Sequence, residues 1–213
     1  MPPDPNMPSK KGAAFWNDRF DDATYVYGTA PNAFVADAAP AFLPAPTTVL
    51  DLGAGEGRNT VFLAEQGHRV TAADYSEAGL RKTHALADQR GLTVETMHVD
   101  VATWTPQRTW DGIVVTFLHG PDAWRAHLYA LLHDSLAPGG CLIAEWFRPE
   151  QRTKGYTSGG PPRADMMVTA DELRTHFDAS GIERLDVATP SLDEGPHHRG
   201  PAATVRFVWR KPV

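Results

Sequence analysis

The sequence has little cysteine, no long apolar run and no excess of positive charge. Cys141 is its single cysteine, so no internal disulfide can form. No stretch of eighteen or more apolar residues is present to span a bilayer. The opening Met-Pro-Pro-Asp-Pro-Asn lacks the basic segment and apolar core of a secretory signal. We therefore expect a cytoplasmic protein without a membrane partner.

The charge balance argues against a nucleic-acid partner. The formal net charge is −6, whereas binding to a polyanion depends largely on Lys and Arg neutralising phosphates. A hydrophobic fraction of 42% and a charged fraction of 22% are typical of a globular domain. We expect a small-molecule partner, and the sequence does not indicate an oligomeric state.

The 213 residues suffice for one domain and are too few for two independent cores. Three prolines before residue 6 prevent a continuous helix, so residues 1–12 are predicted to be a mobile tail. A single domain is predicted over 13–213, with an N-terminal cap over 13–46. Apolar spacing within this cap predicts helices over 13–20 and 32–42.

Apolar strand-like runs then alternate with amphipathic helical segments, the pattern of a parallel sheet covered on both faces. The predicted fold class is α/β, a Rossmann-like three-layer sandwich. Two final strands have no helix between them and should pair antiparallel, giving a seven-stranded, mostly parallel sheet whose last strand is antiparallel. The predicted strands are 48–52, 69–73, 94–99, 112–117, 141–146, 182–188 and 204–209, and the helices between them are 59–66, 77–90, 123–136 and 170–179.

The segment Asp51-Leu-Gly-Ala-Gly-Glu-Gly57 turns from a strand into a helix through three alternating glycines. Glycine is needed where a nucleotide lies against bare backbone and where φ is positive. Asp74 ends the next strand, where a carboxylate can accept hydrogen bonds from both ribose hydroxyls. An NAD fingerprint would place its third glycine at position 58, which is Arg58. The pattern favours a nucleoside cofactor, although a purely structural turn is the alternative.

Two further motifs follow in order. Asp100 follows the third strand and can accept from an adenine amine, with Val101 against the ring. Leu136-Ala-Pro-Gly-Gly140 precedes the fifth strand. With the glycine turn and Asp74, this set resembles the class I S-adenosylmethionine-dependent methyltransferases over roughly residues 47–146. The resemblance implies S-adenosylmethionine as cofactor.

A closer resemblance lies outside this core. Phe15-Trp-Asn-Asp-Arg-Phe20, Tyr25-Val-Tyr-Gly-Thr-Ala-Pro-Asn32 and Leu192-Asp-Glu-Gly-Pro-His-His-Arg-Gly200 are similar to the tellurite-resistance and thiopurine methyltransferase-like branch. The resemblance implies that the N-terminal segment covers the amino-acid end of the cofactor. Arg19 or Arg58 can pair with a carboxylate there, and an aromatic ring can stabilise a sulfonium cation. The expected cofactor residues are Trp16, Arg19, Tyr27, Gly28, Asp51, Gly53, Gly55, Gly57, Arg58, Asp74, Tyr75, Asp100, Val101 and Phe117.

The methyl acceptor is expected between two segments, 148–167 and 190–200. The first is predicted to be a lid without secondary structure, because such a long irregular stretch in a compact domain usually serves a site. Basic residues there and nearby make an anionic or strongly nucleophilic acceptor plausible. The expected acceptor residues are Arg163, His198, Arg199 and Arg206, and the candidate bases are His119 and His197. No metal site is predicted, because Glu194, His197 and His198 lie on one loop without helical spacing.

The predicted function is S-adenosylmethionine-dependent methylation of a small molecule such as a thiol, an oxyanion or a heterocycle. A protein that binds the cofactor as a regulatory module without turnover is the alternative, since fold alone does not decide function. The glycine spacing disfavours an NAD-dependent oxidoreductase.

Overall fold

A computed structural model describes residues 10–213 of the chain. The first helix, α1 (Lys10–Phe20), begins three residues before the predicted one. Residues 10–12 of the predicted tail therefore belong to this helix, and residues 1–9 lie outside the described part. The second cap helix is α2 (Ala33–Phe42), whose N-cap Asn32 accepts a hydrogen bond from the Val35 N–H.

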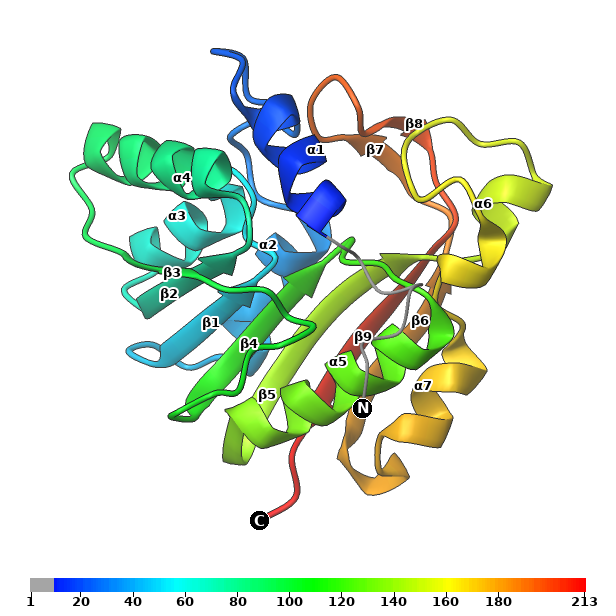
Figure 1. The fold of residues 1–213 in the computed structure, drawn as a ribbon. Coiled ribbons are helices and arrows are strands. Elements are labelled where there is room, and N and C mark those ends of the chain that lie inside the picture. The colour runs from blue at the N-terminus through cyan, green and yellow to red at the C-terminus, as the bar shows by residue number, and fades with distance from the viewer. Residues whose placement is uncertain (1–9) are drawn as a thin grey trace.

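Seven strands form one sheet in the order β3-β2-β1-β4-β5-β9-β6 (Figure 1). The five strands from β3 to β5 are parallel, and β9 lies between β5 and β6 and is antiparallel to both. The predicted fold class is thus confirmed, including the antiparallel last strand. The strands are β1 (Thr48–Leu52), β2 (Arg69–Asp74), β3 (Glu95–His98), β4 (Trp110–Thr116), β5 (Leu136–Phe147), β6 (Ile182–Ala188) and β9 (Thr204–Arg210).

Helices cover both faces of this sheet because its central strands are apolar on both sides. One face carries α2, α3 (Arg58–Glu65) and α4 (Glu77–Gln89), with Phe34 and Leu63 packed against Val114 and Ile143. The other face carries α5 (Asp122–Ser135) and α7 (Ala170–His176), which pack on strand residues such as Ile113 (Figure 1). The carboxyl ends of the five parallel strands therefore meet at one edge, where open α/β sheets bind ligands.

The predicted lid is more ordered than expected. It contains α6 (Glu150–Thr153) and a 3₁₀ helix η1 (Ala164–Met166). The prediction of a segment without secondary structure was wrong, and one of its basic residues folds back on the segment's own backbone. The Arg152 guanidinium donates to the carbonyls of Gly159, Gly160 and Pro161.

The second predicted wall is not an irregular loop either. β7 (Ser191–Asp193) and β8 (Arg199–Pro201) pair antiparallel as a separate two-stranded hairpin. We call residues 191–201 the hairpin. Leu192, Glu194 and His198 of the hairpin are buried, whereas the residues at its tip, Pro196 and His197, are exposed. Among residues 10–213, no helix is long and apolar enough to cross a membrane.

Candidate functional site

The glycine turn joins β1 to α3 at the carboxyl edge of the sheet. Gly53, Gly55 and Gly57 all have positive φ angles. At Gly57 the close approach of α4 adds a second requirement, since a Cβ there would lie 2.6 Å from Thr83 Cγ2. A Cβ on Gly53 or Gly55 would meet only the side chains of Leu118 or Phe20, at 3.3 and 3.4 Å. Two side chains thus lie over bare backbone, and a ligand on this turn would displace them.

Asp74 ends β2 beside this turn and is buried. Its carboxylate accepts hydrogen bonds from the Gly55 N–H and the Ser76 N–H, both at 2.8 Å. Burial raises the pKa of Asp74, and these backbone hydrogen bonds oppose the rise. Because each carboxylate oxygen has a second lone pair, Asp74 can still accept from two further donors.

Asp51 lies beneath the same turn at the end of β1. One of its oxygens accepts from the Thr60 hydroxyl at 2.6 Å, and the other is buried without a partner among the described residues. Burial raises the pKa of Asp51 to about 6. An orphaned acceptor next to bare glycine backbone is what a site for a polar ligand with donor groups provides.

Asp100 and Val101, the two residues expected at the adenine, follow strand β3. Asp100 is exposed and accepts from the Ala102 N–H at 2.9 Å. Val101 is buried in the core on the α5 side of the sheet. The Val99 N–H donates to the Asp74 carbonyl at 2.9 Å, which brings the end of β3 beside the predicted ribose acid.

Helix α1 covers the glycine turn from the N-terminal side. Asn17 accepts from the Ser76 hydroxyl and the Ala78 N–H at the start of α4, which fixes α1 over this edge. The ring centroids of Trp16 and Phe20 are 5.3 Å apart, and the Tyr27 ring lies within 6.4 Å of both. The predicted Tyr75 also lies under α1, since a Cβ on Gly12 would be 3.2 Å from its hydroxyl.

The segment between α1 and α2, residues 21–32, forms what we call the strap. The Glu56 carboxylate, from the glycine turn, accepts from the Val26 and Tyr27 N–H groups. Lys82 on α4 donates to the carbonyls of Asp22 and Thr24 and pairs with Glu56 at 2.6 Å. Two charged side chains therefore hold the strap on the turn.

The strap crosses the hairpin where two glycines meet. A Cβ on Gly195 would lie 2.5 Å from the Gly28 nitrogen and 2.6 Å from the Tyr27 carbonyl carbon. Both glycines have positive φ angles. Two of the three segments that carry the closer family resemblance are thus in backbone contact.

Aromatic rings fill the space between this crossing and the end of β4. The His198 ring centroid lies 4.5 Å from that of Tyr27, 4.6 Å from Phe117 and 5.5 Å from Phe147. Phe117 has φ +55°, a strained value for a bulky residue and one that is concentrated at functional sites. Burial lowers the pKa of His198, and the nearby Glu194 carboxylate opposes this shift.

His119, a predicted base, follows Phe117 at the same edge. Its Nε2 accepts from the Phe147 N–H at 3.3 Å, and its Nδ1 is buried without a partner in the described part of the chain. Burial lowers the pKa of His119 to about 3. The ring is therefore neutral at ordinary pH, with its Nε2 lone pair engaged.

Most of the predicted cations are paired with carboxylates. Arg58 pairs with Glu194 at 2.7 Å and Arg206 with Glu145 at 2.7 Å, both largely buried. Arg163 and Arg199 are exposed, and each pairs with a nearby aspartate, Asp165 and Asp193. The contacts do not bring Arg163 to the aromatic cluster. Arg19 differs, because no carboxylate of residues 10–213 lies within ion-pair distance of it.

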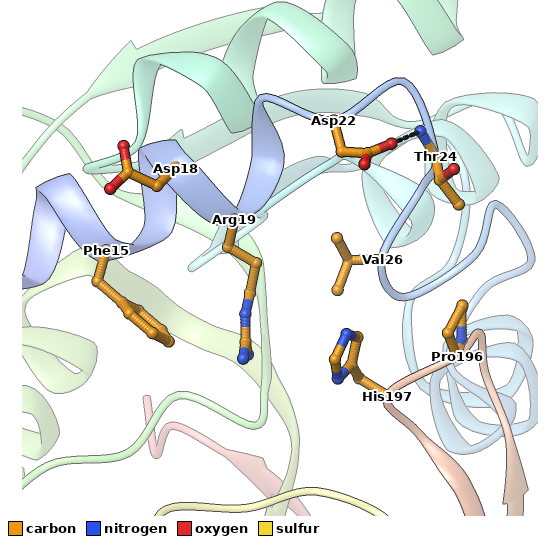
Figure 2. A pocket seen from close by; sticks show the side chains of 8 residues that line it. All are labelled: Phe15, Asp18, Arg19, Asp22, Thr24, Val26, Pro196 and His197. Carbon is orange, nitrogen blue, oxygen red and sulfur yellow. Dashed lines mark hydrogen bonds between the residues drawn. The ribbon is translucent and has the colours of Figure 1, made fainter.

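Arg19 faces a cavity of about 480 Å³ between α1, the strap and the hairpin tip. Figure 2 shows Arg19 and His197 approaching the same space from opposite walls. The Arg19 guanidinium donates to the Tyr27 hydroxyl at 3.1 Å and lies over the rings of Phe15 and Trp16. Neither the three glycines nor Asp74 line this cavity, so it lies outside the strap rather than on the glycine turn.

Several site residues were missed from the sequence. Glu56 occupies a variable position of the glycine motif, and Asn32 was noted only as part of the N-terminal motif. Glu145 and Glu194 act through partners more than a hundred residues away, for which a single sequence holds no signal. No group of three His, Cys, Asp or Glu side chains placed to hold a metal ion is found among the residues that the structure describes.

Comparison with known sequences gives a family match over residues 49–140, to the family described as a methyltransferase domain. The probable S-adenosyl-L-methionine-dependent methyltransferase TehB of Haemophilus influenzae is 34% identical over 88 residues, covering 41% of this chain and 30% of that protein. Trans-aconitate 2-methyltransferase of Variovorax paradoxus is 30% identical over 142 residues, covering 62% of this chain and 52% of that protein. The chain thus spans about half or less of the length of these relatives.

Solved structures show the same fold. The TehB structure from Haemophilus influenzae superposes with a TM-score of 0.69 at 19% identity, over 93% of this chain and 66% of that one. A Burkholderia thailandensis N1-methyltransferase, solved with 1,6-didemethyltoxoflavin and S-adenosylhomocysteine, gives a TM-score of 0.60 at 26% identity, over 85% of this chain and 79% of that one. These matches confirm the resemblance to S-adenosylmethionine-dependent methyltransferases and the Rossmann-like fold.

Proposed function

We propose that this chain, whose residues 49–140 form a methyltransferase domain, transfers a methyl group from S-adenosylmethionine to a small molecule. The observation that carries the proposal is the pair of acids at the glycine turn. Asp74 has free lone pairs beside bare backbone, and Asp51 has a buried oxygen without a partner among the described residues. Both acids suit the hydroxyl and amino donors of this cofactor.

The residues present fit the cofactor. Asp74 would hold the ribose, Asp100 and Val101 the adenine, and the glycine turn the methionine moiety. The candidates for the methionine carboxylate are Arg58, which lies at the glycine turn but is paired with Glu194, and Arg19, which has no carboxylate partner among the described residues but faces the cavity outside the strap. The rings of Trp16 and Tyr27 would lie near the sulfonium.

The cofactor, when bound, supplies an activated methyl group and its own leaving group. The chain therefore has to orient the acceptor and exclude water. The strap, held by Glu56 and Lys82, covers the glycine turn for this purpose. The rings of Tyr27, Phe117, Phe147 and His198 form an apolar lining for the acceptor beyond β4.

We infer that the acceptor is a thiol, an oxyanion, a heterocycle or a carboxylate. Carboxylates join the list because relatives are named trans-aconitate 2-methyltransferases. Arg163, Arg199 and Arg206 support an anionic acceptor less than the sequence suggests, since each is paired with an acid.

The test is release of S-adenosylhomocysteine from S-adenosylmethionine with an acceptor panel drawn from these four classes. Turnover with one class and not the others supports the proposal and identifies the acceptor. Binding of S-adenosylhomocysteine without turnover on any of them would favour a non-catalytic regulatory module. Failure to bind it would overturn the proposal.

A further inference from the structure

We propose that Glu194 is a positioning residue, which locks the hairpin to the strap and to α3 and thereby fixes His198 and Tyr27 over Phe117. The inference rests on the proposed function, because it concerns the acceptor side of that site. Glu194 contacts neither the glycine turn's bare backbone nor the open cavity, so it acts through its partners.

The Glu194 carboxylate has partners on three segments. One oxygen accepts from the Asn32 side chain at 3.1 Å and from the Ala33 N–H at 3.2 Å. The other pairs with the Arg58 guanidinium at 2.7 Å, and His198 Nδ1 lies 3.7 Å from it. The side chain is 6% exposed. A single carboxylate thus joins the end of the strap, the start of α3 and the hairpin.

The charge state of Glu194 agrees with this arrangement. Burial alone would raise its pKa, but the interactions with His198 and Arg58 lower it to about 2. The carboxylate is therefore ionised at any ordinary pH. Replacing it by a neutral group would leave Arg58 as a buried cation without its partner. An uncompensated buried charge of this kind is strongly destabilising.

The other attachments of the hairpin lie on its opposite side and at its base, where the Ser158 hydroxyl donates to the Pro201 carbonyl at 2.7 Å. Leu192 packs on Phe147, Met167 and Ala202, which anchors the base of the hairpin. Toward the tip the buried side chains are Glu194 and His198, and Gly195 contacts the strap through backbone. Without Glu194, the ring of His198 would lose the element that holds it against Phe117 and Tyr27.

A second acid of the network acts independently of the hairpin. Glu145 on β5 accepts from Asn32, Thr204 and Arg206, so Asn32 keeps one carboxylate when Glu194 is neutralised. Glu194→Gln should therefore leave α2 capped and the domain folded. The expected damage is confined to the hairpin and the strap crossing.

The experiment compares Glu194→Gln with Glu172→Gln. Glu172 is a partly buried acid that also pairs with a buried arginine, Arg125 at 2.6 Å, but it joins α7 to α5. We expect both variants to lower the melting temperature by similar amounts. We expect Glu194→Gln to lower kcat/KM for the acceptor by about tenfold or more, because a misplaced wall of an acceptor site is costly. The affinity of this variant for S-adenosylhomocysteine should stay within about threefold of the wild-type value. A general loss of stability would not lower acceptor turnover while leaving this affinity unchanged.

Two outcomes would overturn the inference. One is an equal loss of acceptor turnover in Glu172→Gln, which would make the effect one of stability. The other is wild-type acceptor kinetics in Glu194→Gln. The double variant Arg58→Gln, Glu194→Gln separates the buried charge from positioning, since it should recover stability while acceptor turnover stays low. If Glu194→Gln does not fold, Glu194→Asp, which keeps the charge on a shorter side chain, replaces it.

Hydrogen exchange separates this inference from the proposed function. If the wild-type chain neither binds S-adenosylhomocysteine nor releases it, the proposed function fails. The backbone amides of residues 191–201 should still exchange faster in Glu194→Gln than in Glu172→Gln, because the contacts of Glu194 are present in the free protein. Equal rates of hydrogen exchange in the two variants would show that Glu194 does not hold the hairpin in place.

Discussion

Asp51 is a buried acid whose pKa is raised to about 6 by burial, with one oxygen lacking a partner among the described residues. A carboxyl group whose folded pKa is raised stabilises the fold fully below its unfolded pKa of roughly 4, and this contribution is lost as pH rises through 6. Asp51→Asn has no such loss. The free energy of unfolding of the variant, relative to wild type, should therefore increase between pH 4 and 7, by at most roughly 3 kcal/mol. Urea titrations across this range test it, and a pH-independent difference would contradict the burial argument.

Asp74→Ala should weaken binding of S-adenosylhomocysteine by about a hundredfold or more, since two hydrogen bonds to a charged group are lost at about 1.5–3 kcal/mol each. The substitution should also lower the stability of the fold. Asp74 also accepts from Gly55 and Ser76, so we expect about 1–3 kcal/mol of stability to be lost as well. Thr169→Ala, which removes the N-cap of α7, is the control for lost stability. Calorimetry giving the wild-type dissociation constant for Asp74→Ala would remove Asp74 from the ribose site.

His119 tests the choice of base. Because its pKa is lowered to about 3 and its Nε2 accepts from the Phe147 N–H, we expect no ionisation of His119 in the pH profile of kcat/KM between pH 5 and 9. His119→Asn keeps an acceptor for that N–H and should leave the shape of the profile unchanged. If the variant loses an acidic limb of the profile, where a base is protonated and inactive, His119 is the base that the sequence predicted.

Among the elements, the crossing of strap and hairpin offers a matched pair of glycines. Gly195 and Gly200 lie in the same hairpin, both with positive φ angles. A Cβ at Gly195 would collide with the backbone of Gly28, whereas a Cβ at Gly200 meets nothing within 4 Å. Gly195→Ala should thus lower acceptor turnover by about tenfold or more, and Gly200→Ala should show the backbone strain alone, about 1 kcal/mol. Steady-state kinetics and thermal unfolding of both variants check this, and equal kinetics would mean that the crossing does not shape the site.

The elements that the sequence predicted are those with local signals. Alternating apolar runs located the seven strands of the main sheet, and the cap residue Ser76 located the start of α4. The sequence did not predict the hairpin or α6, because the folding of these segments depends on tertiary contacts. Examples are the hydrogen bonds of Arg152 to the carbonyls around Gly160 and the ion pair of Glu194 with Arg58. The same division holds in the site. The glycine turn and Asp74 follow a local pattern, whereas the pairing of Arg206 with Glu145 could not be foreseen and makes this arginine less available than expected.

At the scale of the whole molecule, the family match and the proposed acceptor walls come from different parts of the chain. The match covers residues 49–140, which include the glycine turn and the acids Asp51, Asp74 and Asp100. The strap precedes this range, and the hairpin follows it. The strap and the hairpin thus meet above the carboxyl edge of the sheet (Figure 1), where they cover the glycine turn. This arrangement explains why the family predicts the cofactor more readily than the acceptor.

The central claim is that the glycine turn and Asp74 hold S-adenosylmethionine. Its most direct test is calorimetric titration of the wild-type chain with S-adenosylhomocysteine and, separately, with NAD⁺. We predict one saturable site for S-adenosylhomocysteine, weakened by about a hundredfold or more in Asp74→Ala, and no binding of NAD⁺. Binding of NAD⁺ in preference to S-adenosylhomocysteine, or no binding of S-adenosylhomocysteine at all, would contradict the account.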